Sequence, residues 1–297
     1  MPETDSRLRG VMTAILTPMD MSGRLMLEAM PALIDFQRAA GIDGIVVCGT
    51  NGEGTSLTVE ERKQTLEAAM RRAGGLTVVA GTGAANAPDT IELTCHAAAL
   101  GVDAALVLPP FFFKSPASAG LTAYFESILD AVELPVLLYN IPQMTSVPIT
   151  DALLRSLAGH PRLAGVKDSA GDWPRTDALI RAFPELAVFS GSDYLAERCL
   201  GAGGAGCISG GANPFPETVV AVRDAFVRGD TLDIEGAQQR LDQMLDILVR
   251  YPFVGASKSV LANRGLPRMG VRPPLVNLTA DEESAMLEEF RSAGFAV

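Results

Sequence analysis

The feature that most constrains the fold of this chain is a regular alternation of short apolar runs with longer amphipathic segments. The runs are rich in β-branched residues and are apolar at successive positions, which is typical of strands covered on both faces of a parallel sheet. The segment at 58–73 opens with Thr58 and has Glu61 three residues later, the spacing of a helix capping box. Eight such runs occur, at residues 11–18, 42–50, 76–83, 102–109, 135–142, 163–169, 186–193 and 205–210.

Strand-helix alternation repeated eight times predicts an α/β fold, a (β/α)8 TIM barrel. An open, doubly wound sheet is the competing architecture. Beyond the eighth run the strand pattern ends, and the sequence predicts helices at 232–249, 257–264 and 280–293. We therefore expect a catalytic barrel over residues 1–229 and a C-terminal helical bundle over residues 230–297. No low-complexity linker separates them, so the two parts should pack together.

Charge and hydropathy limit the partners that the chain can have. The 35 acidic side chains exceed the 24 lysines and arginines, and the formal net charge is −11. This balance argues against binding to nucleic acid or to an anionic membrane, because both require a cationic surface. The sequence has no apolar run long enough to span a bilayer, and its first residues do not resemble an apolar secretory leader. We therefore expect a cytoplasmic protein.

Lysines are rare in this chain, and one of them occupies a position suited to chemistry. In a barrel of this type the active site forms where strands end. Lys167 follows the apolar residues 163–166 of the sixth run and should point into the barrel mouth. In contrast, Lys63, Lys114 and Lys258 have ordinary positions on a helix face, in a loop and in a C-terminal helix. Desolvation disfavours the charged form of an amine, which makes Lys167 a candidate nucleophile for a Schiff base with a ketone. The structural alternative is an ion pair with Asp168 or a neighbouring carboxylate.

Two further segments meet the predicted mouth of the barrel. Tyr139 ends the fifth run, beside the strand that carries Lys167, where its phenol could relay protons or its ring could simply pack at the rim. The glycine-rich turn at 49–54 contains Thr50 and Asn51 and suits a small carboxylate. Its glycine order is not that of a dinucleotide site. The two histidines have no paired-ligand spacing, so we expect no metal site.

Four short motifs carry a resemblance to a known family. They are GTNGE at 49–53, LYNIP at 138–142, GVKDS at 165–169 and VRPPL at 271–275. With them the chain resembles the dihydrodipicolinate synthase / N-acetylneuraminate lyase family of class I aldolases, closest to the members that act on 2-keto-3-deoxy sugar acids. The resemblance implies that Lys167 attacks the keto carbon of pyruvate or another 2-oxo acid, that Tyr139 shuttles protons, and that Thr50 and Asn51 hold the carboxylate. It also implies no cofactor, because the iminium is the electron sink.

Departures from the family pattern bear on the substrate. The lysine-pathway synthases carry an arginine where this chain has Met144, and a tyrosine supplied by a neighbouring subunit where it has Phe112. Both differences weigh against lysine biosynthesis. Sialic acid lyases carry a glutamate in place of Tyr194, which weighs against sialic acid. The resemblance places five further positions against the substrate, several of them facing a hydroxylated tail: Ser169, Gly191, Asp193, Ile208 and Ser209.

The leading hypothesis is reversible aldol cleavage of a 2-keto-3-deoxy sugar acid, or a related 4-hydroxy-2-oxo acid, to pyruvate and an aldehyde. The alternatives are dehydration of such an acid through the same imine, condensation of pyruvate with aspartate semialdehyde, and a barrel that binds 2-oxo acids without turnover. The run PPFFF at 109–113 would expose an apolar patch on a monomer. Together with the resemblance, it suggests a homotetramer made of two tight dimers.

Overall fold

The barrel predicted from the eight apolar runs is present. The computed structural model describes residues 7–229 and 231–297. Its eight strands are all parallel and close into a barrel in sequence order, with β8 pairing back to β1. The open-sheet alternative is therefore wrong, because an open sheet has two edge strands with one neighbour each, whereas each of these eight strands has two. The strands are β1 Gly10–Ala14, β2 Gly44–Val47, β3 Thr77–Gly81, β4 Ala104–Val107, β5 Val136–Asn140, β6 Leu163–Asp168, β7 Ala187–Ser190 and β8 Gly206–Ser209.

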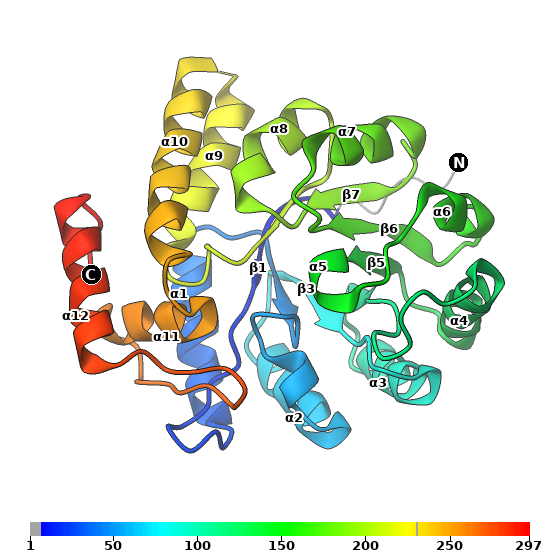
Figure 1. The fold of residues 1–297 in the computed structure, drawn as a ribbon, viewed down its shortest axis with the longest axis horizontal. Helices are drawn as coiled ribbons and strands as arrows, with labels where there is room; N and C mark the ends of the chain where they lie inside the picture. Colours follow the sequence, from blue (N-terminus) through cyan, green and yellow to red (C-terminus); the bar gives the residue numbers. More distant parts are fainter. Residues whose placement is uncertain (1–6, 230) are drawn as a thin grey trace.

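Helices surround the barrel, and the last three extend it on one side (Figure 1). By length and hydropathy, none of the helices in the described ranges could span a membrane. Three short 3-10 helices, η1 Leu27–Ala29, η2 Gly54–Ser56 and η3 Asp193–Leu195, lie in loops. The α-helices are α1 Met30–Ala39, α2 Val59–Met70, α3 Ala87–Ala99, α4 Ser118–Ala131, α5 Pro142–Thr145, α6 Asp151–Leu157, α7 Trp173–Ala182, α8 Ala196–Gly201, α9 Pro216–Arg228, α10 Thr231–Leu248, α11 Phe253–Asn263 and α12 Ala280–Ser292.

Side chains alternate across every strand, so the sheet is apolar on both faces. Met12, Val46 and Phe189 fill the inside of the barrel. Their neighbours along the strands, such as Ile45 and Val188, pack outward in the shell between sheet and helices. Successive side chains of a strand point to opposite faces, and here both faces are dry. This is why the strand sequences are continuous apolar runs.

The predicted helix ends are mostly confirmed. Thr58 forms the expected capping box with Glu61 at the start of α2, and Thr279 forms another at the start of α12. The prediction for α11 was wrong at its N-terminus, because the helix begins at Phe253 and not at residue 257. The Ser257 hydroxyl donates to the Phe253 carbonyl at 2.8 Å within the helix, so this serine does not cap it.

The helical extension and the barrel share one apolar core. Helix α10 packs along α9, and the buried side chains of α9 to α12 meet Val11 and Cys207 from the barrel strands. The expected packing of the two parts is therefore present. The predicted boundary at 229/230 adjoins residue 230, which lies outside the described residues. Residues 1–6, on which the expected absence of a leader partly depends, also lie outside them.

Lys258 is not the ordinary helix lysine that we expected. Its ammonium is fully buried and lies 2.5 Å from a carboxylate oxygen of Glu53, which is equally buried. The ammonium also donates to the Gly270 carbonyl at 2.6 Å. Burial lowers the pKa of Lys258, and the neighbouring Glu53 opposes that shift. Because Glu53 belongs to the glycine-rich turn after β2, this pair joins the C-terminal extension to the mouth of the barrel.

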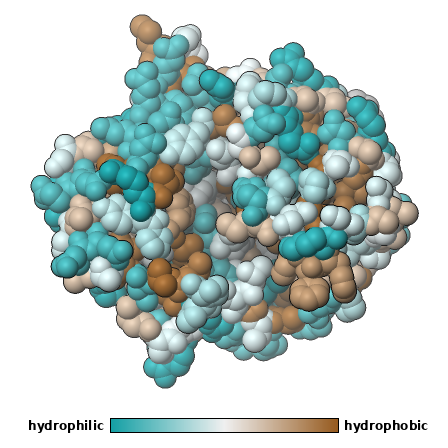
Figure 2. Space-filling model, in the orientation of Figure 1, coloured by the Kyte–Doolittle hydropathy of each residue, from teal (hydrophilic) through white to brown (hydrophobic). Residues whose placement is uncertain are grey.

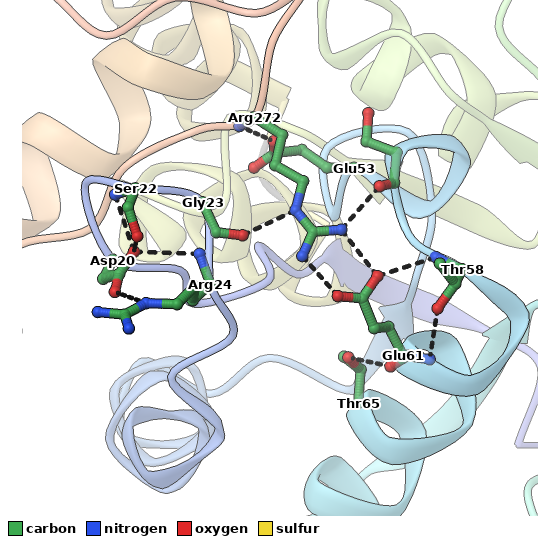
Figure 3. Close-up of polar contacts among 10 residues, drawn as sticks. Asp20, Ser22, Gly23, Arg24, Glu53, Thr58, Glu61, Thr65 and Arg272 are labelled. Atoms are coloured by element: carbon green, nitrogen blue, oxygen red, sulfur yellow. Dashed lines mark hydrogen bonds and ion pairs between the residues drawn. The ribbon is translucent and has the colours of Figure 1, made fainter.

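Arg272 makes a second connection between the extension and the barrel (Figure 3). Its guanidinium donates to both carboxylate oxygens of Glu61 on α2, at 2.6 and 2.7 Å. It also donates to the carbonyls of Gly23 and Ser56, and its backbone N–H donates to Glu53 at 2.9 Å. Hydrogen bonds from Arg272 lower the pKa of Glu61 to about 2, so this carboxylate is charged at neutral pH. The segment that begins at Arg272 is thus held against α2.

Replacing Lys258 by methionine should destabilise the protein by about 3–5 kcal/mol, because it leaves the Glu53 carboxylate buried without its cation. The free energy of unfolding from urea titration measures the effect. The double variant Lys258→Met/Glu53→Gln should recover part of the loss, since no buried charge remains. Lys63→Met is the matched control, because its partially exposed pair with Glu92 should contribute no more than about 1 kcal/mol. Equal losses in the two single variants would contradict the role assigned to Lys258.

Candidate active site

A cavity of about 770 Å³ opens at the carboxyl ends of the barrel strands. Strand ends and loops of the barrel line one side, and the C-terminal extension lines the other. In Figure 2 the hollowed centre of this face is bordered by apolar residues. The cavity brings together eight of the nine site residues predicted from the sequence: Thr50, Asn51, Tyr139, Lys167, Ser169, Gly191, Asp193 and Ile208.

Lys167 and Tyr139 are held side by side by the register of two strands. The pairing of β5 with β6 sets Tyr139 opposite Lys167, so both side chains point into the barrel. The Lys167 amine lies 4.4 Å from the centre of the tyrosine ring, and the lysine is only 5% exposed. The next pair in register points outward, where Asn140 donates to Asp168 at 2.6 Å. Thr176 also donates to Asp168, and the Arg175 guanidinium lies 3.7 Å from it. Asp168 therefore faces away from Lys167, and the alternative ion pair between these two residues is absent.

The phenol of Tyr139 is connected to the glycine-rich turn. Its oxygen lies 3.1 Å from the Thr50 hydroxyl, within hydrogen-bond distance. Burial raises the pKa of Tyr139, but the charge of Lys167 and the hydrogen bond with Thr50 lower it. The resulting pKa of Tyr139 is below that of an ordinary tyrosine. A phenol whose pKa is lowered gives up and takes back a proton more readily near neutral pH. Tyr139 and Thr50 therefore form a two-hydroxyl path that ends beside the lysine.

The turn at 49–54 presents hydrogen-bond donors to the cavity. Within the described chain, the backbone N–H groups of Thr50 and Asn51 donate to no protein acceptor. Free N–H groups in a tight turn suit a carboxylate. The Asn51 amide packs against Gly210, where a Cβ atom would lie 2.6 Å from Nδ2. Only glycine at 210 leaves the amide in this position, and the buried Glu53–Lys258 pair anchors the same turn from behind.

Ser169 is a buried hydroxyl beside the Tyr139 phenol. It is 8% exposed and forms no well-aligned hydrogen bond with any described residue, although it lies near enough to the phenol to help lower the pKa of Tyr139. It lies over Gly191, where a Cβ atom would come within 1.8 Å of the Ser169 oxygen and 2.9 Å of Lys167 Cε. Buried hydroxyls normally have a partner, so this one is available to a ligand in the cavity. Gly191 provides the space in which the serine and the lysine lie together.

At the end of β8, the structure differs from the prediction for one site residue, Ser209. Ile208 points into the cavity, whereas Ser209 is fully buried, does not line the cavity and accepts a hydrogen bond from the Ala212 N–H at 2.8 Å. Alternation along the strand turns Ser209 outward, and the next lining position is Gly210, which has no hydroxyl. Asp193 lines the cavity, but its two oxygens already accept from the Gly211 N–H at 2.8 Å and the Cys207 thiol at 3.3 Å.

The sequence analysis missed the contribution of the C-terminal extension to the cavity. Helix periodicity identifies a buried face but not what that face meets, and only the motif at 271–275 pointed to this part of the chain. Among the described residues that line the cavity, Lys167 is the only lysine or arginine. The described chain contains no group of three or more metal-ligating side chains. The extension contributes Leu245, Val249, Pro252, Phe253, Val254, Gly255, Pro274, Leu275 and Val276 to the lining.

Replacing Gly191 by alanine should sharply slow any reaction of the Lys167 amine while leaving the fold intact. The new methyl group would collide with the Ser169 oxygen and press on the lysine side chain. The rate of borohydride trapping of a pyruvate imine, with circular dichroism as a check of folding, measures the effect. Gly120→Ala on α4 is the matched control, because a methyl group there meets no atom within 4 Å. Trapping by Gly191→Ala at the rate of this control would contradict the assigned geometry.

Comparison with known proteins shows which family the chain resembles over nearly its whole length. The family described as the dihydrodipicolinate synthetase family matches residues 7–292. An uncharacterized DapA-like lyase of Chloroflexus aurantiacus is 41% identical over 284 residues, covering 94% of both chains. A 4-hydroxy-tetrahydrodipicolinate synthase of Exiguobacterium sibiricum is 37% identical, over 96% of this chain and 97% of the relative.

Solved structures give the same result. YagE of Escherichia coli K12, solved in complex with pyruvate, superposes with a TM-score of 0.92 at 31% identity, over 97% of this chain and 99% of YagE. A catalytic lysine mutant of the sialic acid aldolase of Ruminococcus gnavus gives a TM-score of 0.92 at 26% identity, over 98% of both chains. The chain is an enzyme of the aldolase and lyase class, and it belongs to the dihydrodipicolinate synthetase family.

Proposed function

We propose that this enzyme cleaves a 4-hydroxy-2-oxo acid to pyruvate and an aldehyde through an imine on Lys167. The observation that carries the proposal is a buried amine at the floor of an open cavity, beside the hydrogen-bonded Tyr139–Thr50 pair. Among the described residues no carboxylate forms an ion pair with this amine, and Asp168, the neighbour along the strand, faces the other way. A 2-oxo acid is the ligand that such a site suits, because it offers a ketone to the amine and a carboxylate to the turn.

The reaction follows from this placement. The carboxylate of the substrate accepts from the free N–H groups of Thr50 and Asn51, which brings the keto carbon to Lys167. The amine adds to that carbon, and Tyr139 passes the proton that lets the hydroxyl leave as water, giving an iminium. When a base removes the proton of the C4 hydroxyl, the bond between C3 and C4 breaks and its electron pair moves into the iminium. The aldehyde leaves, the enamine is protonated at C3, and water releases pyruvate.

The proton path differs from one in which a tyrosine supplies a third hydroxyl beside those of Tyr139 and Thr50. Within the described chain the Thr50 hydroxyl meets no other hydroxyl than that of Tyr139. Phe112, which stands where the lysine-pathway synthases have a tyrosine, has no hydroxyl and is 74% exposed. The proton therefore passes from Thr50 directly to water or to the substrate in the cavity.

The lining of the cavity bears on the competing reactions. Condensation with aspartate semialdehyde brings in a second carboxylate, and Lys167 is the only cation among the described lining residues. Met144 cannot supply the missing charge.

Dehydration of a sugar acid uses the same imine, and product analysis separates it from cleavage, because dehydration leaves the carbon chain whole. For a sugar acid, the Ser169 hydroxyl is available to form a hydrogen bond with the substrate. Both carboxylate oxygens of Asp193 already accept hydrogen bonds from the protein.

The assembly and location of the enzyme also belong to this proposal. Phe112 and Phe113 are each 74% exposed, beside the proline pair of the same loop. Such a patch favours an interface between copies of the chain. We propose a homotetramer of two tight dimers that acts in the cytoplasm with pyruvate as its small-molecule partner.

Borohydride reduction in the presence of pyruvate should add one pyruvate-derived group to Lys167, because the imine is reduced to a stable secondary amine. Intact mass and peptide mapping detect and locate the adduct. Lys167→Arg should give none, whereas Lys114→Arg, a change at a loop lysine, should give the same adduct as the native enzyme. A native enzyme that binds pyruvate without any adduct would instead support the barrel that binds without turnover.

Tyr139→Phe should slow imine and enamine formation about 10²- to 10⁴-fold, the usual contribution of a positioned proton donor. Exchange of the pyruvate methyl hydrogens in D₂O, followed by ¹H NMR, reports this step without knowledge of the aldehyde. Tyr124→Phe is the matched control, because its hydroxyl bonds to Thr90 on α3, away from the lysine. Unchanged exchange in Tyr139→Phe would overturn the proton-transfer role.

A further inference from the structure

The two sides of the cavity differ in polarity. The barrel contributes Lys167 and hydroxyl and amide groups such as Ser169 and Asn51. Every lining residue that the C-terminal extension contributes is apolar, from Leu245 on α10 to Val276. A ligand that fills the cavity from the lysine outward therefore passes from a polar floor to an apolar wall.

The apolar wall continues to the mouth of the cavity. Five of the large apolar side chains that the described chain exposes line this one cavity, and they come from different elements. Water-exposed apolar side chains scattered singly need no explanation, but a group that rims a pocket indicates a binding surface. They are Met144 on α5, Tyr194 on η3, Val249 just after α10, and Leu275 and Val276, with exposures of 65%, 40%, 52%, 39% and 58%.

The charged groups nearby are already paired, so they do not make this wall polar. The Glu53 carboxylate is bonded to Lys258 and to the backbone of Arg272. The Tyr194 hydroxyl donates to Asp246 at 2.9 Å. The ring of Tyr194, not its polar end, is thus the part left to line the mouth.

The wall is also held in place. Arg272 binds Glu61 through two hydrogen bonds and the carbonyls of Gly23 and Ser56 through two more (Figure 3). Three residues later, the Leu275 N–H donates to the Arg272 carbonyl at 3.0 Å. A bidentate arginine–carboxylate pair has a defined geometry as well as strength. Leu275 and Val276 are therefore presented by an anchored segment, and preorganised surfaces bind with a smaller entropic cost.

We propose that this wall selects the aldehyde half of the substrate, and that this half carries an apolar aliphatic or aromatic substituent. The proposal rests on the function proposed above, since it assumes that the 2-oxo acid end is bound at Lys167. The apolar substituent lies against Val249, Leu275 and Val276, while the C4 hydroxyl stays near Ser169. A polyhydroxylated tail of the same length would lose water at this wall without gaining hydrogen bonds.

The test measures condensation of pyruvate with aldehydes of equal chain length that differ in polarity, butanal against D-erythrose, with benzaldehyde as an aromatic probe. The native enzyme should favour the apolar aldehydes by about 10- to 200-fold in kcat/KM, the range by which hydrophobic pockets discriminate. Preference for erythrose by an enzyme that forms the pyruvate imine would overturn this inference and leave the proposed function standing. Absence of the imine would overturn both.

A variant of the apolar wall tests whether the aldehyde preference comes from this wall. Val249→Thr/Val276→Thr keeps the shape of both side chains and adds two hydroxyls to the wall, so the preference for butanal over erythrose should fall about tenfold or more, mainly through KM. Val227→Thr is the matched control, because Val227 is 77% exposed on α9 and does not line the cavity. Light scattering accompanies the assay. A changed oligomeric state with unchanged aldehyde preference would show that a second copy of the chain covers this wall, and would overturn the inference.

Discussion

Strict alternation of side chains in a closed parallel barrel is the constraint on which the rest of this structure depends. It sets Tyr139 and Lys167 side by side on the inside and Asn140 and Asp168 side by side on the outside. The first pair is the one to which we assign the chemistry, and the second pair forms a buried hydrogen bond that stabilises the same two strands. A shift of either strand by one residue would exchange these roles, because every side chain would move to the opposite face.

The glycine-rich turn depends on a second interaction, which reaches it from the far end of the sequence. Glu53 lies in the turn, and Lys258 lies on α11 of the extension. A buried ion pair is weak support for stability as such, since desolvation opposes it. Its position gives it another consequence: the turn that offers N–H groups to a carboxylate and the segment that forms the apolar wall meet at Glu53. The extension thereby forms part of the candidate active site.

Much of this arrangement could be predicted from the sequence. The apolar runs identified all eight strands, and the capping box at Thr58 identified the start of α2. Lys167, Tyr139 and Thr50 followed from their positions at strand ends. Ser209 was placed wrongly in the site because the choice between it and Gly210 depends on where β8 ends and which way its last side chain turns. Lys258 was missed because nothing in a helical pattern shows that its partner lies about two hundred residues earlier.

The sequence by itself determined the kind of fold and the kind of chemistry. Its periodicity specifies which segments are strands, and a lysine at the end of a strand must face either the cavity or the helices. We expected Lys167 to face the cavity, but only the tertiary structure decided what else lines that cavity and how its wall is held. These properties depend on contacts between residues far apart in the chain, such as Arg272 with Glu61. Local patterns do not reveal such contacts, because residues far apart in the sequence come within interaction distance only when the chain folds.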